Sequence, residues 1–442
     1  MELPNHILYC IQTLEAAGYP AFAVGGCVRD WLLGLTPHDY DLCTGADPET
    51  IQKIFAEHSL VLAGVKHGTV GVVFPEGVVE ITTFRTEGGY ADSRHPDWVR
   101  FVPEVEEDLA RRDFTINAMA WSPSRGLVDP FGGQEDLRAG ILRAVGQPAK
   151  RFQEDSLRIL RGVRFAVRFG LEPDLATEAA MLGQAHLMDL LARERVFDEF
   201  CKLLPLVTAK DLIRFSRVLT QPIPELAGAI GFDQHSPHHA YDLFTHTACV
   251  VEAVPADLTL RWAALLHDVG KLPCFTTDEN GRGHFYGHAR EGSAIAEVIL
   301  RRLKAPNALR ERVVTLIDLH MTRLEPDRKL LRRRLSRLGQ DTVEQMLSLQ
   351  EADMGSKGTG HEEELEIFPQ VRQLLQELYA ENACLKIADL AVDGKDLMAL
   401  GYPADRRLGE TLSYLLEQVV EENLPNERDV LLQAAAKRLQ DL

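Results

Sequence analysis

Residues 24–42 read VGGCVRDWLLGLTPHDYDL, a stretch that combines a glycine pair, a short helical segment and two carboxylates. The helix is expected to open directly after Gly25 and Gly26. Their missing side chains would let backbone N–H groups approach a phosphate closely at the helix amino terminus. Arg29 adds positive potential on the first turn. The stretch therefore predicts a phosphate-binding turn that leads into a carboxylate pair.

The two carboxylates are Asp39 and Asp41, two residues apart on a segment expected to be extended. Alternate residues of an extended segment face the same way, so both side chains are expected to lie close together, as shared ligands of Mg²⁺ require. Glu80, at the start of the strand-like run EITTF, is the candidate third carboxylate from a neighbouring strand. Such a set could hold two metals that orient a 3′ hydroxyl and neutralise a triphosphate during an in-line displacement.

The spacing of apolar residues divides the chain into a mixed amino-terminal part and a helical remainder. Between residues 21 and 121, short apolar runs such as AFAVGG and VGVVF alternate with turns and helical stretches, which predicts a small α/β domain. From Leu137 onward, apolar residues recur mostly at helical spacing. The expected fold class is α+β, a small mixed α/β head followed by an elongated all-α neck, body and tail.

The charge balance is strongly acidic. The 442 residues include 48 Lys and Arg against 66 Asp and Glu, a formal net charge of −18. Any nucleic-acid site must therefore be a local basic patch. The seven cysteines are scattered without CxxC pairs, and no uncharged apolar run approaches the length of a membrane span. A cytoplasmic protein without membrane contact is expected.

Longer motifs resemble those of a known family. In order they are GGCVRD, HDYDL, EITTFRTEGGYADSRHPDWVRF, EEDLARRDFTINAMAW, DPFGGQEDLRAGILRAVG and RFQEDSLRILRGVRFAVRFG. Their order and spacing resemble the class II tRNA nucleotidyltransferases and bacterial poly(A) polymerases, and DGKDLMALGYPADRRLGETLSYLLEQVV resembles the helical carboxy-terminal part of that family. The resemblance implies a head like that of DNA polymerase β with Mg²⁺ bound, and tRNA, CTP and ATP as partners.

The resemblance also implies roles for individual residues. Asp39 and Asp41 match the family's catalytic, metal-binding carboxylates, and Glu80 matches the position of their expected third catalytic partner. The match RRDFTINAMA, which in the family contacts the ribose and triphosphate of the incoming nucleotide, contains Arg112, Asp113 and Asn117. An Arg can fork onto phosphate oxygens, while Asp and Asn can hydrogen-bond ribose hydroxyls. The alternative for Arg112 and Asp113 is an ordinary ion pair at a helix start.

Base selection is expected at Asp155 and Arg158 in the sequence EDSLR. Three apart on a helix, they would share a face, where an acceptor and a donor can meet the Watson–Crick edge of one base. In the family this element acts as an amino-acid template that accepts C or A and rejects G and U. The alternative is a surface ion pair. Arg161 and Arg164, in the same match, belong to the predicted nucleotide-binding set.

Two basic runs are candidate paths for a phosphate backbone. Residues 138–168 carry eight basic side chains against Glu154 and Asp155, a local net charge of +6. Residues 323–337 are similarly basic. Such runs are more often solvated helix faces than binding sites. Because neither run is interleaved with stacking aromatics, recognition of tRNA shape rather than unpaired sequence is expected.

The segment YADSRHPDW resembles a mobile loop of family members that add the terminal A or complete CCA. Members that add only CC tend to lack or shorten this loop. Its candidate functional residues are Tyr90, Asp92 and Arg94. The segment therefore argues against an enzyme that adds only CC.

A second site is predicted where imidazoles and a carboxylate recur within helices, a donor set that suits a transition-metal ion. This pattern resembles an HD-type phosphohydrolase domain, although related chains also carry HD-like folds as inert scaffold. His320 is preferred over Asp318 as the last ligand, and His284 is expected to be a bystander. The predicted ligands are His246, His267, Asp268, His288 and His320.

The expected function is template-independent addition of C, C and A from CTP and ATP to the 3′ end of tRNA, with a metal-dependent phosphohydrolase in the HD domain. One alternative is an A-adding enzyme that works with a separate CC-adding enzyme. Another is an HD phosphohydrolase with a non-catalytic RNA-binding head. A poly(A) polymerase is less favoured because bacterial poly(A) polymerases are expected to carry a strongly basic carboxy-terminal extension, whereas this sequence ends in the modestly charged RLQDL. The expected domains are a nucleotidyltransferase head (1–135), a neck with nucleotide-selection and RNA-binding helices (136–232), an HD domain (233–340) and a tRNA-binding helical tail (341–442).

Overall fold

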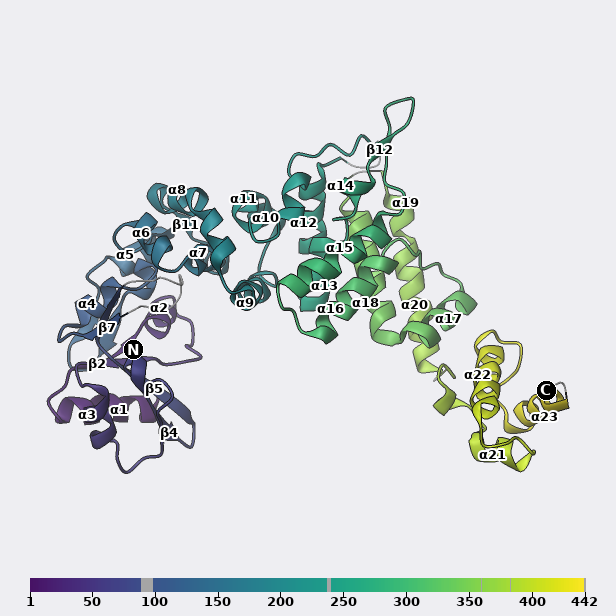
Figure 1. Cartoon of the computed structure of the whole chain (residues 1–442), viewed down its shortest axis with the longest axis horizontal. Helices are drawn as coiled ribbons and strands as arrows, with labels where there is room; N and C mark the ends of the chain where they lie inside the picture. Colours follow the sequence, from purple (N-terminus) through teal and green to yellow (C-terminus); the bar gives the residue numbers. More distant parts are fainter. Residues whose placement is uncertain (89–97, 237–239, 359, 382, 441–442) are drawn as a thin grey trace. The chain divides into compact units, whose positions relative to one another are not determined.

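The structure, a computed structural model, describes residues 1–88, 98–236, 240–358, 360–381 and 383–440. Figure 1 shows a mixed α/β head at the amino-terminal end and helices through the remainder of the chain, which confirms the predicted fold class. Within the described ranges, none of the helices combines the length and the apolar character that a membrane crossing needs. The chain divides into two compact units, Met1–Val207 with Arg214–Ala227, and Thr208–Ile213 with Gly228–Leu442.

The head is built on a sheet that, among the described residues, has seven strands in the order β3-β4-β5-β2-β1-β8-β9. Strands β2 and β5 are parallel and pair Leu42 with Ile81, whereas the other neighbouring strands are antiparallel. Strand β5 alternates the buried Val79 and Ile81 with the exposed Val78 and Glu80, as expected for a sheet covered on one face. The strands are β1 (Ala21–Val24), β2 (Leu42–Thr44), β3 (Leu60–Val61), β4 (Thr69–Phe74), β5 (Gly77–Thr83), β8 (Ala120–Ser122) and β9 (Gly126–Val128).

Helices of the head cover the sheet and enclose an apolar core. Helix α1 packs on β1, and α3 packs on β4 and β5. Phe22, Phe84 and Leu109 are members of one buried cluster in the head. The helices are α1 (Asn5–Ala16), α2 (Gly26–Leu32), α3 (Pro48–Ile54), α4 (Val105–Ala110), α5 (Gly133–Ala139) and the 3₁₀ turns η1 (Val65–His67) and η2 (Thr115–Asn117). The antiparallel pair β6 (Arg85–Gly88) and β7 (Trp98–Phe101) flanks residues 89–97, so the predicted Tyr90, Asp92 and Arg94 lie outside the described residues.

The neck is a set of short helices packed around α7. Apolar residues recur at helical spacing in its sequence LRILRGVRFAVRF, and the helix ends at Gly170, whose φ of 62° is the left-handed conformation that glycine accepts readily. Helix α7 packs against α9. The elements are α6 (Pro148–Glu154), α7 (Leu157–Phe169), α8 (Leu175–Gly183), α9 (Arg193–Leu203), α11 (Ser216–Leu219), η3 (Ala185–Leu190), η4 (Pro224–Ala229), β10 (Ile141–Leu142) and β11 (Glu172–Pro173). Helix α10 (Ala209–Arg214) lies between α9 and α11 in the sequence, but its residues up to Ile213 belong to the second unit.

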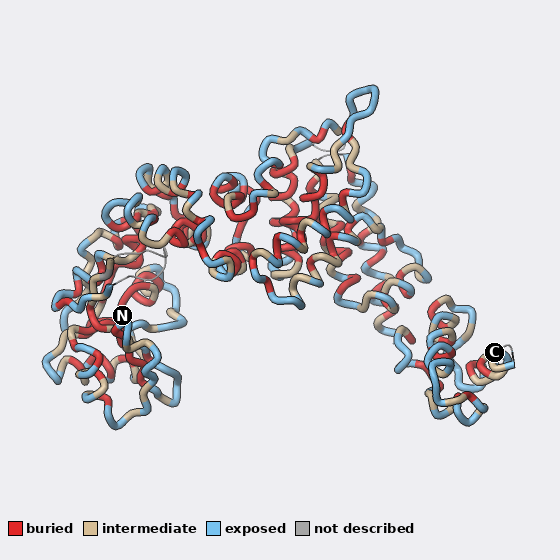
Figure 2. The backbone as a smooth tube through the Cα atoms, in the orientation of Figure 1, coloured by how far each residue is buried: buried red, intermediate tan, exposed pale blue. Residues whose placement is uncertain are grey.

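The second unit begins with a helical body in which α13 packs against α12, α16 and α18, and α15 packs against α16. Figure 2 shows long buried stretches along these helices. Asp242 and Asp257 cap the amino termini of α12 and α13 by accepting backbone N–H groups, which begins each helix at a defined residue. The elements are α12 (Leu243–Ala253), α13 (Leu258–Leu266), α14 (Lys271–Cys274), α15 (His288–Arg302), α16 (Asn307–Leu319), α18 (Gln340–Gly355), β12 (Thr276–Thr277) and β13 (Gly283–His284).

The remaining helices include three at the end of the chain that share an apolar cluster of their own. Leu397, Leu415 and Leu431 are fully buried in it, and the Tyr402 hydroxyl donates to the carbonyl of Ala435 at 2.8 Å. This cluster orders the end of the chain without a sheet. The helices are α17 (Arg328–Leu338), α19 (Glu362–Leu365), α20 (Ile367–Ala380), α21 (Gly394–Ala399), α22 (Arg406–Val420), α23 (Arg428–Gln440) and η5 (Ile387–Asp389).

Candidate functional site

The glycine turn lies where β1 passes into α2. Gly25 has a φ of 77°, and Gly26 is the first residue of α2. A Cβ atom on Gly25 would lie 2.7 Å from Nη1 of Arg112, so the guanidinium rests directly against the backbone of the turn. Only glycine satisfies both the positive φ and this close approach. Gly25 itself is buried and its N–H donates to the carbonyl of Met119 at 3.0 Å, so the turn places the positive charge of Arg112 beside the start of α2.

Asp39 and Asp41 are exposed and directly precede β2. The pKa of Asp41 is raised, first by desolvation of its carboxyl group, with Arg112 opposing the rise and Asp39 adding to it. Two carboxylates that repel each other in this way form a favourable oxygen-ligand set for a divalent cation. Glu80 is exposed on β5, next to β2. Among the described residues, two groups of three possible metal ligands have their ligand atoms within 4.8 Å of one another, and both groups lie in the second unit. Glu80 therefore does not form such a group with Asp39 and Asp41.

A chain of hydrogen bonds joins the predicted ribose- and phosphate-binding residues. Arg29 Nη1 donates to Asn117 Oδ1 at 2.5 Å, and Asn117 Nδ2 donates to Asp113 Oδ1 at 3.0 Å. Arg161 donates from Nε and Nη2 to Asp113 Oδ2 at 2.9 and 2.7 Å. Arg29 is buried, and its guanidinium lies 4.4 Å from the ring centroid of Phe169. These contacts hold four predicted site residues in one rigid network.

The alternative ion pair between Arg112 and Asp113 does not form. Arg112 pairs with Asp108 at 3.5 Å, whereas Asp113 pairs with Arg161 at 2.7 Å. The helix-start interpretation of these two residues is therefore wrong, because Asp113 is held by a residue far along the chain.

The stability of the protein is expected to depend on Asp113 at acid pH. Burial alone would raise the pKa of Asp113, but Arg161 and Asn117 lower it from 3.8 to about 2. A carboxyl group whose pKa is lower in the folded than in the unfolded state stabilises the fold at pH values above its unfolded-state pKa. The free energy of unfolding should therefore decrease by roughly 2 kcal/mol as the pH falls from about 4 to about 2. The measurement is the free energy of unfolding against pH for the wild type and Asp113→Asn. The difference between them should shrink across this window, and a constant difference would contradict the assignment.

The predicted base-reading pair does not share a helix face. Helix α6 ends at Glu154, and Asp155 follows in an extended conformation with φ of −146° and ψ of 102° before α7 begins. Asp155 pairs with Arg195 at 2.9 Å, and Arg158 pairs with Glu154 at the same distance. The expectation of one continuous helix is wrong because the backbone turns at Asp155. The two side chains therefore have separate partners.

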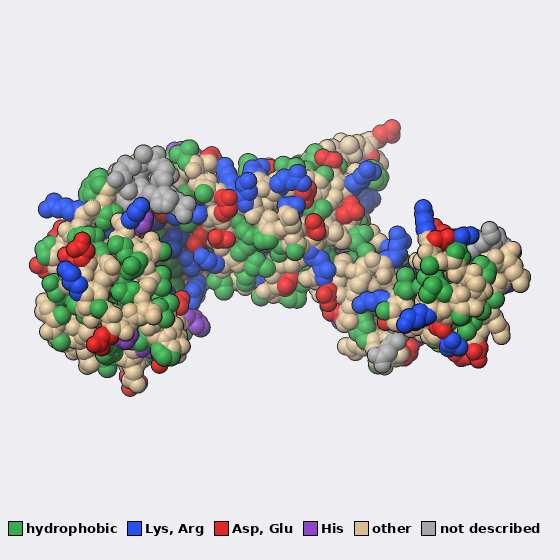
Figure 3. Space-filling model, turned by 60° about the horizontal axis from the view of Figure 1, so that its bottom comes forward, with side chains coloured by type: hydrophobic (Ala, Val, Ile, Leu, Met, Phe, Trp, Pro, Cys, Tyr) green, Lys and Arg blue, Asp and Glu red, His purple; other side chains and the backbone are tan. Residues whose placement is uncertain are grey.

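The first basic run is largely neutralised by ion pairs. Figure 3 shows Lys and Arg side chains interspersed with Asp and Glu side chains on the visible face. Arg164 is buried against Glu199, with Nε 2.7 Å from Oε2, so its charge is satisfied inside the protein. In the second run, Arg328, Arg332 and Arg333 also meet acidic partners. In the first run, the paired residues are Arg143, Arg151, Arg158, Arg161 and Arg164.

All five predicted metal ligands of the second unit come together in its helical body. The two Asp268 carboxylate oxygens face different imidazoles, Oδ2 facing His267 at 3.1 Å and Oδ1 facing His288 at 3.5 Å. Asp268 thereby belongs to two groups of three whose ligand atoms lie within 4.8 Å of one another. The two groups are His246 with His267 and Asp268, and Asp268 with His288 and His320.

The imidazoles are oriented by the backbone. Nδ1 of each lies against a carbonyl oxygen, at 3.1 Å for His246, 2.8 Å for His267, 2.8 Å for His288 and 2.6 Å for His320. A carbonyl oxygen only accepts, so each Nδ1 carries a hydrogen and each ring directs Nε2 into the cluster. The Nε2 atoms of His288 and His320 are only 3.1 Å apart. This is the arrangement that histidine ligands of a metal adopt, and the residues fit a bound cation.

The charges within the cluster are strongly coupled. Burial and the neighbouring His267 lower the pKa of His320 to about 4, and burial lowers the pKa of His288. Burial would raise the pKa of Asp268, but His267 and Lys271 hold it well below its usual value. Burial would lower the pKa of His267, yet the carboxylate of Asp268 raises it. Neutral His288 and His320 beside an ionised Asp268 provide the protonation states that metal ligation requires.

Asp353 is a member of this cluster that the sequence analysis missed. Its Oδ1 lies 3.0 Å from Nε2 of His246, and its pKa is lowered by that histidine and by Lys357 against the effect of burial. It comes from α18, which extends beyond residue 340, where the HD domain is expected to end. The available clue is its helical spacing from the buried Val343, Met346 and Gln350, which places a carboxylate on a buried face.

The other candidates of this region lie outside the cluster. Asp318 is exposed, whereas His320 is buried within the cluster. His284 pairs with Asp278 at 3.2 Å on the β12–β13 hairpin. Of these three side chains, only that of His320 lies in the cluster, so it remains the proposed ligand.

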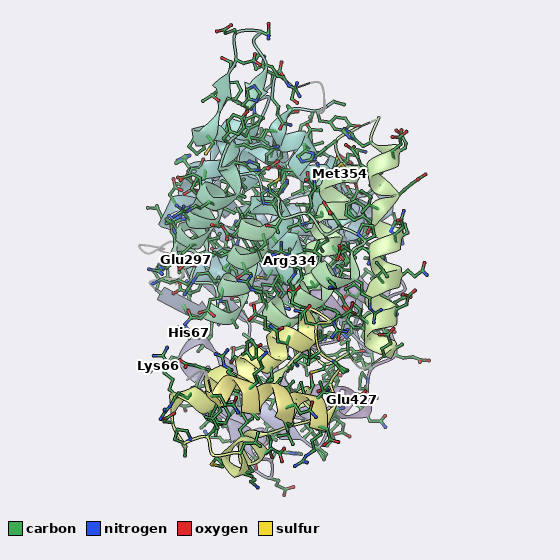
Figure 4. All side chains as sticks on the ribbon, turned by 90° about the vertical axis from the view of Figure 1, so that its right-hand side faces the viewer. Lys66, His67, Glu297, Arg334, Met354 and Glu427 are labelled. Carbon is green, nitrogen blue, oxygen red and sulfur yellow. The ribbon has the colours of Figure 1, made fainter. Side chains whose placement is uncertain are left out.

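A small cavity of about 110 Å³ opens beside the cluster. His320 and Asp353 form the part of its lining that belongs to the cluster. Met354, labelled in Figure 4, and Phe368 contribute apolar walls, and Lys357 contributes a positive charge. The cavity thus places apolar walls and a positive charge next to His320 and Asp353.

Comparisons with known proteins cover both units. The model of the poly A polymerase head domain matches residues 21–143, and that of a putative tRNA nucleotidyltransferase domain 2 matches residues 288–435. The crystal structure of the Bacillus stearothermophilus CCA-adding enzyme in complex with CTP is 29% identical, with a TM-score of 0.72, and the match covers 100% of this chain and 99% of that one. The Thermotoga maritima CCA-adding enzyme complexed with tRNA is 18% identical with a TM-score of 0.61, covers 98% and 95%, and supports the fold alone.

Curated relatives extend the match along nearly the full length. The CCA-adding enzyme of Lactobacillus helveticus is 34% identical over 434 residues, 98% of this chain and 96% of the relative. That of Latilactobacillus sakei is 35% identical over 427 residues, 96% of each chain. The resemblance in the head motifs is therefore confirmed along both units, and the chain belongs to the CCA-adding enzyme family of nucleotidyltransferases.

Proposed function

We propose that the protein adds C, C and A from CTP and ATP to the 3′ end of tRNA without a nucleic-acid template. The observation that carries this proposal is the network of Arg29, Asn117, Asp113 and Arg161 beside the glycine turn, in a chain that matches CCA-adding enzymes along its length. The matched enzymes were solved with CTP, with ATP and with tRNA. A cytoplasmic location fits these substrates.

Different residues of the head would bind the metal, the phosphates and the ribose during nucleotidyl transfer. Asp39 and Asp41 would hold Mg²⁺, which supplies orientation of the 3′ hydroxyl and neutralisation of the triphosphate charge when bound. The backbone after Gly25 and the guanidinium of Arg112 would bind phosphate oxygens. The amide of Asn117 is fixed by its neighbours and would meet the ribose hydroxyls. Because these groups are already ordered, little conformational entropy is lost when the nucleotide binds.

Base choice would depend on hydrogen-bond polarity at Asp155 and Arg158. Cytosine and adenine both present an amino group next to a ring nitrogen that accepts. Uracil and guanine present a carbonyl oxygen next to a ring N–H. An ionised carboxylate only accepts and a guanidinium only donates, so the pair matches C and A and opposes U and G.

The test of the proposed function offers CTP alone, ATP alone and both nucleotides to tRNAs that end in the discriminator base, C or CC. We expect two additions with CTP alone on the shortest tRNA and three with both nucleotides. ATP alone should extend only the tRNA that ends in CC. Product lengths on a sequencing gel measure each outcome. Failure to add C together with extension of the CC end would establish the A-adding alternative instead.

A second candidate function, metal-dependent phosphate-ester hydrolysis, is proposed for the cluster around Asp268. It is favoured by the four imidazoles whose Nδ1 atoms are each held by a backbone carbonyl, so that all four rings direct Nε2 inward. Imidazole nitrogens with carboxylates suit a transition-metal ion, which would supply Lewis-acid activation when bound. The neighbouring cavity is lined by His320 and Asp353 of the cluster and by Lys357, whose positive charge would favour a phosphate group.

A further inference from the structure

The carboxylate of Asp155 is clamped by a residue that the base-reading motif does not contain. Arg195 on α9 donates from Nη1 to Oδ1 at 3.2 Å and from Nη2 to Oδ2 at 2.9 Å. The backbone N–H of Leu157 also donates to Oδ1, at 3.1 Å. A carboxylate offers about four acceptor positions. Three are therefore in use, and the remaining one is on Oδ2.

The guanidinium of Arg158 is held in a comparable way. Nη1 donates to Oε2 of Glu154 at 2.9 Å and to the carbonyl of Arg151 at 3.1 Å. Nη2 donates to the carbonyl of Arg111 at 3.1 Å. An Arg side chain has five N–H donors. Two donors of Arg158, on Nε and Nη2, are thus left after these three hydrogen bonds.

We propose that Arg195 is a positioning residue that determines nucleotide specificity through Asp155. The inference rests on the proposed nucleotidyl transfer and on the base-reading role of Asp155 and Arg158. The two-pronged contact fixes the plane of the Asp155 carboxylate, so its remaining acceptor position keeps one direction. An amino group of cytosine or adenine can donate to that position, whereas the carbonyl oxygen of uracil or guanine is repelled by it.

The geometry of the guanidinium is central to this role. A planar Arg fork matches both oxygens of a carboxylate, whereas a Lys ammonium acts as a point charge that leaves the carboxylate free to rotate. Arg195 is well placed for a fixed contact because its side chain and that of Asp155 are 23% and 18% exposed. Without the two hydrogen bonds from Arg195, the Asp155 carboxylate could rotate among several orientations. The amino group of an incoming base would then have to fix the orientation of the carboxylate when the nucleotide binds.

The experiment measures kcat/KM for CTP, ATP, UTP and GTP with Arg195→Met, on tRNAs ending in the discriminator base and in CC. We expect the preference for CTP over UTP, and for ATP over GTP, to fall roughly tenfold or more. Arg195→Lys should lie between Arg195→Met and the wild type. The matched control is Arg193→Met on the same helix. This substitution removes the same charge, but Arg193 donates to the carbonyl of Asp189 rather than to Asp155. Thermal unfolding of each variant separates a loss of fold from a loss of selectivity.

A double-mutant cycle tests whether Arg195 acts through Asp155. If it does, Arg195→Met should change selectivity little in an Asp155→Asn background, because the effects of residues in one contact are not additive. An equal loss of efficiency for all four nucleotides, or a full effect in the Asp155→Asn background, would overturn the proposal. A wild-type chain that adds neither C nor A would instead refute the proposed function.

Discussion

Replacement of Asp41 by Ala is expected to reduce nucleotide addition by at least about a thousandfold, while tRNA binding changes little. Asp41 adjoins β2, and with Asp39 it forms the proposed oxygen-ligand pair of the head. Removal of one carboxylate lowers the affinity for Mg²⁺ and takes away charge compensation in the transition state, where the interaction matters most. Single-turnover incorporation of CTP and a separate tRNA-binding titration measure the two quantities.

The control for Asp41→Ala is Glu76→Ala, which removes an exposed carboxylate from the turn between β4 and β5. Glu76→Ala should leave addition at the wild-type rate. Glu80→Ala is informative in the same assay, because Glu80 lies on the strand next to β2 but does not complete a tight three-carboxylate group. If Asp41→Ala retained nucleotide addition, the proposal that Asp39 and Asp41 bind Mg²⁺ would be refuted.

Replacement of Asp268 by Asn is expected to abolish metal binding in the second unit and to reduce any phosphate-ester hydrolysis there by at least about a hundredfold. Asp268 belongs to both groups of ligands, and its Oδ2 lies 2.7 Å from Nζ of Lys271. The Asn side chain has nearly the same shape but no charge, so it cannot compensate a cation between the imidazoles. The measurements are metal content by elemental mass spectrometry and release of phosphate from p-nitrophenyl phosphate.

Asp318→Asn is the matched control for Asp268→Asn, because Asp318 is exposed and lies two residues before His320. It should keep both metal content and hydrolysis. Nucleotide addition should remain unchanged in both variants. A wild-type protein that carries metal but releases no phosphate would identify the cluster as a structural metal site. Unchanged metal content in Asp268→Asn would refute the ligand assignment.

Local patterns were sufficient for much of the head. The spacing of Asp39 and Asp41 on an extended segment and the glycine pair before α2 are short-range features, and short-range sterics decide them. The histidine pattern likewise predicted Asp268 and the four histidines that meet around it. The prediction that Asp155 and Arg158 share one helix was wrong because of the conformation of a single residue, Asp155. The sequence on both sides of Asp155 has helical periodicity, which does not reveal the turn between α6 and α7.

Long-range partners could not be predicted in this way. Asp155 is held by Arg195, Asp113 by Arg161, and His246 faces Asp353 on α18. In each case the periodicity of a helix indicates which face is buried but not which distant helix covers it.

The sequence by itself therefore determined the α+β fold class, the family and the local chemistry of the head motifs, because each depends on residues close together in the chain. Only the tertiary structure decided which charges are neutralised by partners. It also decided which carboxylate joins the histidine cluster and which arginine pairs with Asp155. Those outcomes depend on how separate helices pack, and packing depends on the shape and burial of side chains from the whole unit.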